Sequence, residues 1–329
     1  MPKAVRFHQL GGPENLVIEE LPAREAEAGE VKLRIQAVGL NRAESMYYHG
    51  RYMEQPVLPS RLGYEVSGVV EAIGPGVDPA WVGKKVATVP GFSQNKYGAL
   101  GEEGILPAES LREYPSNLSP VEAAAIWMQY LTAYFALIHL GKAARGDFVL
   151  IPAASSSVGL AAIQLVKGEG ATSIAASRTS KKRAELLALG ADHVIATAEE
   201  DLPKRVEEIT GGKGARLIFD PVSGPYVETL AAAAAQNGII FEYGALSMEP
   251  TPFPLPQALR KGLSMRGYSL MEFRPRTELM QTATKYIYDR LADGRLKPKI
   301  AKTFPFSRSA EAYRFLESNE QIGKVVITL

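Results

Sequence analysis

The chain opens with short segments in which apolar and polar residues alternate, separated by glycine and proline. The segment 31–38 alternates in this way, and further strands are predicted at 66–73 and 84–89, with a turn rich in glycine and proline at 74–79. Alternation with a period of two is typical of a strand that has one solvated face. Strands at this spacing predict a compact, partly open β-barrel in the first 120 or so residues.

A different pattern begins at Ser119 and Pro120, which mark the start of a helix. Beyond it, apolar runs typical of buried strands alternate with helical stretches. The predicted strands are 147–152, 172–177, 192–195, 215–220, 238–243 and 263–269, and the predicted helices are 158–168, 180–189, 202–209 and 226–235. Strands and helices that alternate in this order form a parallel sheet with helices on both faces.

The C-terminal part is predicted to contain helices at 277–291 and 309–316 and a last strand at 324–329. A strand this short needs an existing sheet to join, and the sheet of the first domain is the economical choice. We therefore expect one domain made of 1–122 together with 268–329, and a second domain made of 123–267.

The connection from the strand at 147–152 to the helix at 158–168 has the layout of a dinucleotide site, where a pyrophosphate rests on N–H groups at a helix N-terminus. The G-x-G-x-x-G motif is absent, because serines stand where glycines are expected. Serine still leaves room for phosphates, and its hydroxyl can cap the helix or donate to a phosphate oxygen. An ordinary strand–helix turn with a serine cap is the alternative. The residues expected to contact the cofactor here are Ser155, Ser156, Ser157, Val158 and Gly159.

The end of the next strand indicates which dinucleotide binds. An acidic residue at this place would hold the ribose 2′-hydroxyl of NAD, but the chain has Ser177 and Arg178, with Lys181 and Lys182 shortly after. A guanidinium and nearby ammonium groups suit the 2′-phosphate of NADP. The sequence therefore favours NADPH, the alternative being a solvated cationic cluster that opposes the dipole of the following helix.

Composition excludes several other classes of protein. The apolar fraction is 46% and the charged fraction 22%, as in a soluble globular enzyme. A net charge of +1 without a basic block argues against nucleic acid or an anionic membrane as the main partner. No apolar run reaches the roughly 20 residues of a membrane span, and the N-terminus lacks a signal-peptide pattern, so a cytoplasmic setting is expected.

Metal and thiol chemistry also lack support. The chain has no cysteine, which excludes disulfides and thiolate-ligated zinc. Its four histidines, His8, His49, His139 and His193, are scattered and form no ligand pair.

Six motifs spread over essentially the whole chain carry a resemblance to a known family. They are Gly39 to Glu44, Leu62 to Gly74, Leu131 to Tyr134, Ala153 to Gly159, Gly190 to Asp192, and Gly323 to Ile327. Together they resemble the medium-chain dehydrogenase/reductase superfamily. This resemblance implies an α/β protein with a GroES-like, partly open β-barrel as catalytic domain (1–122 with 268–329). It also implies a Rossmann domain with a doubly wound parallel sheet that binds NADP (123–267).

The resemblance is to the zinc-free branch, which contains quinone oxidoreductases and enoyl reductases. The zinc branch has cysteine and histidine ligands where this chain has Asn41 and Tyr64, and its third ligand would fall near Gln129. An amide and a phenol do not form the N/S ligand set that zinc prefers. Without a Lewis acid, hydride can pass to an acceptor that is already electron-poor, such as a quinone or the β-carbon of an α,β-unsaturated carbonyl.

The resemblance also identifies candidate site residues. Asn41 is expected near the nicotinamide or the substrate oxygen, or else is a turn residue at a strand end. Tyr52 resembles a proton donor of enoyl thioester reductases, or else is a half-buried aromatic. Tyr64 either lines the substrate site or fills the volume of the missing metal. Thr132 resembles a residue that contacts the cofactor, and the backbone of Gly244, Ala245 and Leu246 is expected beside the nicotinamide ribose.

The leading interpretation is an NADPH-dependent, zinc-independent reductase of quinones or enones. The alternatives are a non-catalytic NADPH-binding protein of crystallin-like or redox-sensing type, and an alcohol dehydrogenase with an unrecognised metal. A homodimer is expected, on the argument that the strand at 239–243 is an exposed sheet edge that a second copy would pair.

Overall fold

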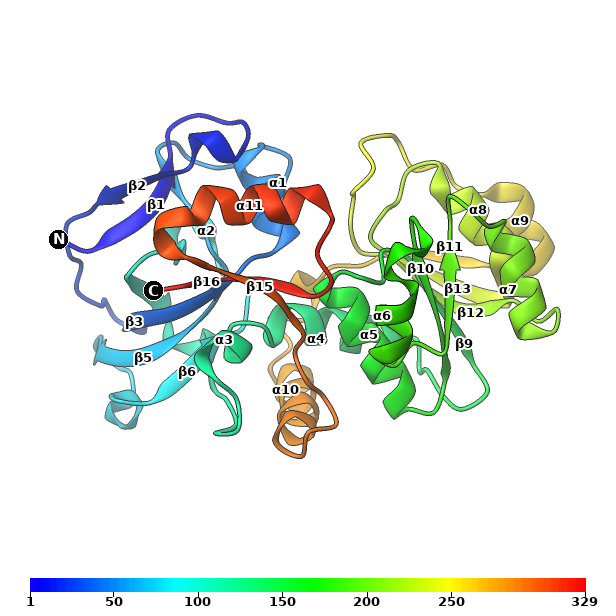
Figure 1. Cartoon of the computed structure of the whole chain (residues 1–329). Coiled ribbons are helices and arrows are strands. Elements are labelled where there is room, and N and C mark those ends of the chain that lie inside the picture. The colour runs from blue at the N-terminus through cyan, green and yellow to red at the C-terminus, as the bar shows by residue number, and fades with distance from the viewer. The chain divides into compact units, whose positions relative to one another are not determined.

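The computed structural model describes all residues, 1–329, and the chain forms two compact units (Figure 1). Unit 1 contains Met1–Met128 and Pro298–Leu329, and unit 2 contains Gln129–Lys297. None of the helices combines the length and the apolar character that a membrane crossing requires.

Unit 1 is built around two sheets. A three-stranded antiparallel sheet has the order β2-β1-β4, and a seven-stranded sheet has the order β15-β16-β3-β5-β6-β8, with β7 also pairing β3. The strands are β1 (Lys3–Phe7), β2 (Val17–Glu20), β3 (Glu30–Gly39), β4 (Ser60–Arg61), β5 (Glu65–Ile73), β6 (Lys85–Thr88), β7 (Glu103–Pro107), β8 (Leu111–Glu113), β15 (Ile300–Pro305) and β16 (Lys324–Thr328). The α-helices are α1 (Arg42–Tyr48), α2 (Gln94–Tyr97), α3 (Pro120–Ala123) and α11 (Ser309–Ser318).

Strand β3 illustrates why the alternating pattern forms this sheet. Val31, Leu33 and Ile35 are buried, whereas Arg34 between them is exposed. Burying one such aliphatic side chain contributes about 1.5–3 kcal/mol. The predicted strands 31–38, 66–73 and 84–89 are confirmed as β3, β5 and β6. The C-terminal strand β16 joins the same sheet, with Val326 opposite Gly39.

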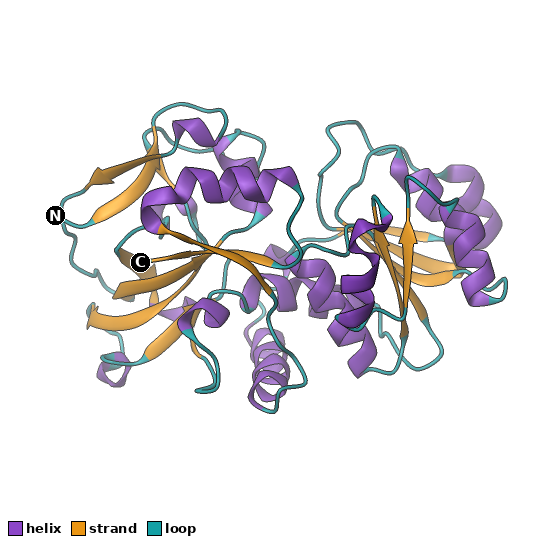
Figure 2. Cartoon of the chain, viewed as in Figure 1, coloured by secondary structure: helices purple, strands orange, loops and turns teal.

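Unit 2 is a six-stranded sheet with helices on both faces. The strand order is β11-β10-β9-β12-β13-β14, and every pair is parallel. The strands are β9 (Phe148–Ile151), β10 (Thr172–Ser177), β11 (His193–Ala196), β12 (Ala215–Asp220), β13 (Ala234–Glu242) and β14 (Ser264–Gly267). The helices are α5 (Ser157–Gly168), α6 (Arg183–Ala188), α7 (Leu202–Thr210), α8 (Tyr226–Ala233), α9 (Leu255–Lys261) and α10 (Thr277–Ala292), while α4 (Trp127–Ala133) precedes the unit's first strand. Helices α5 and α6 cover one face and α7 to α9 the other (Figure 2), so the predicted doubly wound parallel sheet is confirmed.

Three details differ from the sequence-based expectations. Strand β13 begins at Ala234, so the helix predicted at 226–235 ends early; strand pairing across Ala215 and Ala234 overrides the helix propensity of the alanines. The expectation that 239–243 is a sheet edge is wrong, because β14 pairs with the outer side of β13 and is itself the edge.

The third difference concerns the domain boundaries, which were expected at 122/123 and 267/268, whereas the compact units meet at 128/129 and 297/298. Residues 268–297 belong to unit 2, because aromatic side chains attach this segment there. Phe273 stacks on Phe135 with ring centroids 4.2 Å apart, and the Tyr286 hydroxyl donates to Glu169 at 2.5 Å.

Candidate active site

The turn after β9 has the features of a phosphate-binding turn. Ser156 is the N-cap of α5, and its hydroxyl oxygen accepts a hydrogen bond from the Gly159 N–H at 3.0 Å. A Cβ atom added at Gly159 would lie 2.6 Å from the Ala154 carbonyl oxygen, so only glycine permits this close packing of helix on strand end. Ser155 to Val158 are half-buried, and the first turn of α5 therefore presents backbone N–H groups at a positive helix end.

The cationic residues after β10 lie at the same end of the sheet. The Lys182 ammonium donates to the Ser155 hydroxyl at 3.0 Å, which joins the two predicted cofactor segments. Ser177 is buried and its hydroxyl donates to the Thr179 carbonyl at 2.8 Å, whereas Arg178 is exposed. The guanidinium is therefore accessible to a ligand, and the Ser177 side chain is already used within the protein.

A pair of acidic residues in unit 2 was missed by the sequence analysis. Asp220 and Glu242 end β12 and β13 and stand opposite each other in register. The Ser223 hydroxyl donates to Glu242 at 2.6 Å, and the Ser223 N–H donates to Asp220 at 2.9 Å. Burial, followed by the neighbouring Asp220, raises the pKa of Glu242 to about 7, and burial also raises the pKa of Asp220. In such sheets, ligands bind in the crevice at the carboxyl ends of the strands. Two consecutive predicted strands that each end in an acidic residue could therefore have pointed to Asp220 and Glu242.

The remaining candidates of unit 2 lie close to this crevice or within a helix. A Cβ atom added at Gly244 would lie 2.6 Å from the Pro221 carbonyl oxygen, so the backbone is tightly packed there. Ala245 and Leu246 are exposed just beyond it. Thr132 is buried on α4.

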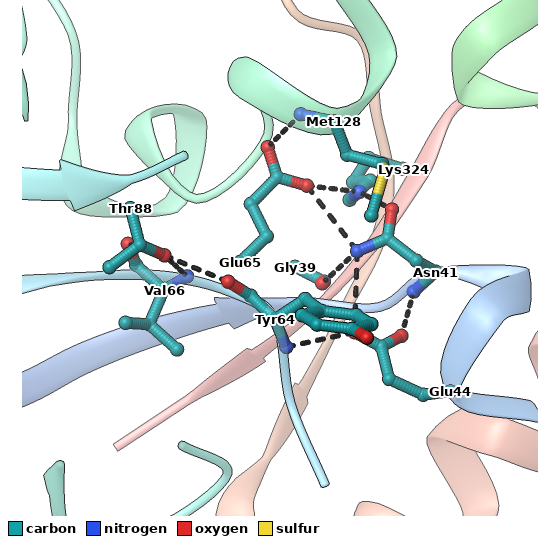
Figure 3. Close-up of polar contacts among 9 residues, drawn as sticks. All are labelled: Gly39, Asn41, Glu44, Tyr64, Glu65, Val66, Thr88, Met128 and Lys324. Atoms are coloured by element: carbon teal, nitrogen blue, oxygen red, sulfur yellow. Dashed lines mark hydrogen bonds and ion pairs between the residues drawn. The ribbon is translucent and has the colours of Figure 1, made fainter. Parts of the chain in front are cut away.

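In unit 1, the candidate Asn41 belongs to a buried polar cluster (Figure 3). Asn41 precedes α1, and its N–H donates to the Glu44 carboxylate in a reciprocal cap. The Asn41 side-chain amide donates to the Gly39 carbonyl at 3.1 Å, and its oxygen accepts from the Lys324 ammonium at 2.6 Å. Both ends of the Asn41 side chain are thus engaged within the protein.

The ion pair between Lys324 and Glu65 forms the centre of this cluster. The ammonium lies 2.6 Å from a Glu65 oxygen, and both side chains are 0% exposed. The second Glu65 oxygen accepts from the Met128 N–H at 3.1 Å. Glu65 therefore holds the Lys324 ammonium and the start of α4 in place, which is a structural role. The Lys324 contact was not foreseen, although a lone lysine before the apolar run 325–327 was a signal.

Glu44 is the second carboxyl group of the cluster and is completely buried. It accepts from the Tyr64 N–H at 3.1 Å and also from the Asn41 backbone. Burial raises the pKa of Glu44 to about 7, against the opposing attraction of the Lys324 charge. Its protonation state therefore changes near neutral pH.

The candidates Tyr52 and Tyr64 lie side by side in unit 1. Their ring centroids are 6.2 Å apart at an interplanar angle of 62°, and Tyr64 also contacts Phe92 at 5.5 Å. Tyr64 is buried, whereas Tyr52 is half-buried. Burial raises the pKa of both phenols, so both remain protonated hydrogen-bond donors at neutral pH.

No group of three or more His, Asp or Glu side chains in the structure is placed to hold a metal ion. Asn41 and Tyr64 stand where the zinc branch is expected to have ligands. Asn41 is hydrogen-bonded to the Lys324 ammonium, and Tyr64 packs among aromatic rings. Gln129, near the third position, is buried.

The two units together define the class of a dehydrogenase or reductase with a GroES-like domain and a Rossmann domain. A family model described as alcohol dehydrogenase GroES-like domain matches residues 27–115, and one described as zinc-binding dehydrogenase matches 157–285. The chain is 30% identical to a 2-haloacrylate reductase of a Burkholderia species over 336 residues, with 99% of each chain covered.

Two solved structures share the fold over the whole chain. One, of an NAD-dependent alcohol dehydrogenase, is 33% identical with a TM-score of 0.90 and 99% of each chain covered. The other, of Escherichia coli quinone oxidoreductase complexed with NADPH, is 29% identical with a TM-score of 0.91, covering 99% of this chain and 100% of that one. The chain belongs to the quinone oxidoreductase branch of the medium-chain dehydrogenase/reductase superfamily.

Proposed function

We propose that the protein is an NADPH-dependent reductase of quinones or of alkenes conjugated to a carbonyl group, and that it works without zinc. The observation that carries this proposal is the contact between Asn41 and Lys324. The Asn41 oxygen already accepts a hydrogen bond from the Lys324 ammonium at 2.6 Å, so the side chain at this position is engaged within the protein, and an amide is not one of the ligands that zinc prefers. Without a Lewis acid to polarise the carbonyl, acceptors that are already electron-poor are favoured.

The residues of unit 2 fit NADPH as the cofactor. The first turn of α5 would hold the pyrophosphate, since its N–H groups and the nearby Lys182 ammonium offer positive charge. The exposed Arg178 guanidinium would bind the 2′-phosphate through paired hydrogen bonds. The tightly packed backbone at Gly244 is the place expected for the nicotinamide ribose. When bound, NADPH would supply the hydride.

The residues of unit 1 would supply a proton or a hydrogen bond. Reduction places negative charge on a carbonyl oxygen, and a donor aimed at that oxygen lowers the barrier. Tyr52 suits this role because it is half-buried and its phenol stays protonated at neutral pH. Tyr64 packs beside it and holds the ring in place. We assign Asn41 a positioning role in the polar cluster of unit 1, because its side-chain amide and its side-chain oxygen are both hydrogen-bonded within the protein.

The similar proteins act on substrates of the expected kind. A haloacrylate is an alkene conjugated to a carboxylate, and a quinone is a conjugated dicarbonyl. The alcohol dehydrogenase among the similar structures favours alcohol oxidation as the second candidate function. A protein that binds NADPH without turnover is the third.

One assay distinguishes these functions. Purified protein is dialysed against a chelator, and NADPH oxidation is followed with benzoquinone, phenanthrenequinone, an open-chain enone, 2-chloroacrylate and a simple aldehyde. We expect turnover of at least one quinone or activated alkene and none of the aldehyde. Aldehyde reduction that zinc restores would favour the alcohol dehydrogenase function. NADPH binding without any turnover would favour a non-catalytic protein.

We further propose a homodimer, formed through the edge strand β14. Its outer backbone groups have no neighbouring strand within unit 2. Just before it, five large apolar side chains between 246 and 259 are exposed, including Leu259 at 77%. An open edge beside exposed apolar groups is commonly covered by a second copy. Light scattering at micromolar concentration should give twice the chain mass, and Leu259→Glu should reduce it to that of one chain.

A further inference from the structure

A basic pocket in unit 1 has no role in the proposed reaction. It lies beside β1, β2 and α2, whose ribbons are blue to cyan in Figure 1. Its volume is about 350 Å³, within the range of small-molecule sites. The charged residues that line it are Lys3, Arg6, Arg24, Arg61, Lys96 and Glu103. Five cationic residues and one carboxylate therefore line the pocket.

Arg61 is the guanidinium of this pocket that forms no ion pair with a carboxylate. Its Nε atom is shielded from water and has no hydrogen-bond partner, and one terminal nitrogen donates weakly to the Glu103 carbonyl oxygen at 3.4 Å. Burial, and then the charges of Arg24 and Arg6, lower the pKa of Arg61 to about 10. Arg61 as a whole is half-buried, but an N–H group shielded from water without a hydrogen bond is costly, and an anion bound to the guanidinium would offset that cost.

The carboxylates close to the pocket are ion-paired with cations other than Arg61 and Arg24. Glu19 is 3.1 Å from Arg6, and Glu30 is 2.9 Å from Lys96. The carboxylate of Glu103 lies 2.9 Å from Lys32. The nearest carboxylate oxygens to Arg24 are 4.0 Å away. Arg61 and Arg24 are therefore the two guanidinium groups most available to a ligand.

The rest of the lining is apolar and indicates what else the ligand carries. Leu21, Pro22, Pro59 and Ile105 contribute to the wall. A free inorganic ion would use the arginines and leave this wall in contact with water. An organic anion with an apolar body would use both parts, because burying apolar area adds to the charge-assisted hydrogen bonds.

We propose that this pocket binds a small organic anion, with a phosphate or carboxylate group on Arg61 and Arg24 and an apolar body against Leu21 and Ile105. The planar guanidinium matches the two oxygens of either group. The pocket lies wholly within unit 1 and shares no residue with the proposed NADPH site. The proposal therefore stands independently of the reaction.

Calorimetric titration tests the proposal on the full chain saturated with NADPH, which keeps the probes away from the cofactor site. The probes are n-hexyl phosphate, hexanoate, inorganic phosphate and hexanol. We expect n-hexyl phosphate or hexanoate to bind at least about tenfold more tightly than inorganic phosphate or hexanol, since neither of the latter can use both parts of the pocket. Phosphate binding as tightly as hexyl phosphate would show an adventitious ion only and overturn the proposal.

Three variants locate the binding. Arg61→Met keeps the aliphatic stem and should weaken the tighter organic anion by about tenfold or more, and Arg24→Gln should weaken it severalfold. Arg34→Met is the matched control, because Arg34 is an exposed arginine of β3 that pairs with Glu71 and does not line the pocket. The Arg34→Met variant should bind the organic anion with the same affinity as the unmodified protein.

The stability of the unliganded protein separates a ligand site from a structural arginine. Since Arg61 has an unpaired buried nitrogen, Arg61→Met should melt at the same temperature as the unmodified protein or higher. A markedly lower melting temperature, together with unchanged anion affinity in Arg24→Gln, would overturn the proposal. So would equal affinity in all three variants.

Discussion

Replacing Lys324 by methionine tests the buried cluster of unit 1 most directly. The ammonium contacts Glu65 and Asn41 at 2.6 Å each, and no part of the Lys324 side chain is exposed. Methionine retains most of the apolar stem, so the change removes the charge and leaves only a small cavity. Two buried carboxyl groups, Glu65 and Glu44, then lack the only cation in direct contact with the cluster.

The expected loss follows from the burial of both partners. Removing one member of a buried ion pair costs about 3–5 kcal/mol, because the other charge stays desolvated and unpaired. Lys324→Met should therefore lower the free energy of unfolding of unit 1 by about that amount. For a domain of this size, the midpoint of thermal unfolding should fall by roughly 10 °C.

The loss should also depend on pH, and the sign follows from Glu44. Burial raises the pKa of Glu44 from 4.5 to about 7, while the Lys324 charge lowers it. A carboxyl whose pKa is raised on folding stabilises the protein below its unfolded pKa, and this stability is lost as the pH rises toward the folded value. In Lys324→Met the folded pKa of Glu44 rises further, so the variant should be weakest relative to the unmodified protein at pH 8 and closest to it at pH 5.

Urea unfolding followed by circular dichroism at pH 5, 6.5 and 8 measures both effects. Lys85→Met is the control, since Lys85 is an exposed lysine of β6 and its replacement should change stability by less than about 0.5 kcal/mol. The double variant Lys324→Met/Glu65→Met should recover more than half of the loss, because it removes the orphaned charge. A single variant within about 1 kcal/mol of the unmodified protein at pH 8 would refute the reasoning.

The remaining predictions concern the cofactor, the proton donor, the acidic pair and the metal. The ratio of kcat/KM for NADPH to that for NADH should be at least about tenfold, and Arg178→Ala should remove most of it by weakening NADPH alone; equal use of both cofactors by the unmodified protein would contradict this. Tyr52→Phe should lower kcat on enones by ~10²-fold or more and spare quinones, whose reduced form can take protons from water; unchanged enone turnover would return Tyr52 to a packing role. Because the pKa of Glu242 is raised to about 7, its contribution to stability is lost as the pH rises from 5 to 8, and Glu242→Gln should flatten that decline in urea unfolding; an unchanged slope would exclude this carboxyl as its source. Elemental analysis after dialysis should find no stoichiometric zinc, and one zinc per chain would overturn the assignment of Asn41 and Tyr64.

The parts of the fold that could be predicted are those determined by neighbouring residues. The strand–turn–helix connection at Ser156 was recognised because its parts follow one another in the chain, and the bond from the Gly159 N–H shows that Ser156 caps the helix, as the sequence allowed. Strand order is not a local property. The run 239–243 has the composition of a buried strand, but nothing in it shows that β14 covers its outer side.

The site of unit 1 could be predicted only in part, because its contacts join distant segments. Asn41 was identified from a motif, but its partner Lys324 lies 283 residues further along the chain. The sequence did not indicate that Glu44 or Glu65 would contact a lysine. Glu44 also fits the start of a helix, and Glu65 also fits a strand. Contact at this separation is decided by how β16 joins β3, which is a property of the sheet.

Net charge was similarly uninformative about where charges act. A total of +1 argued against a polyanionic partner, yet the same chain buries a lysine–glutamate pair and surrounds one pocket with five cations. In the buried pair the charges cancel at 2.6 Å, so they contribute to the fold and little to the external field. In the pocket, by contrast, Arg61 lacks a carboxylate partner, and its field extends to whatever enters. Whether a cation stabilises the fold or attracts a ligand is therefore decided by the distance to its nearest carboxylate. That distance cannot be obtained from the number of charged residues in the sequence.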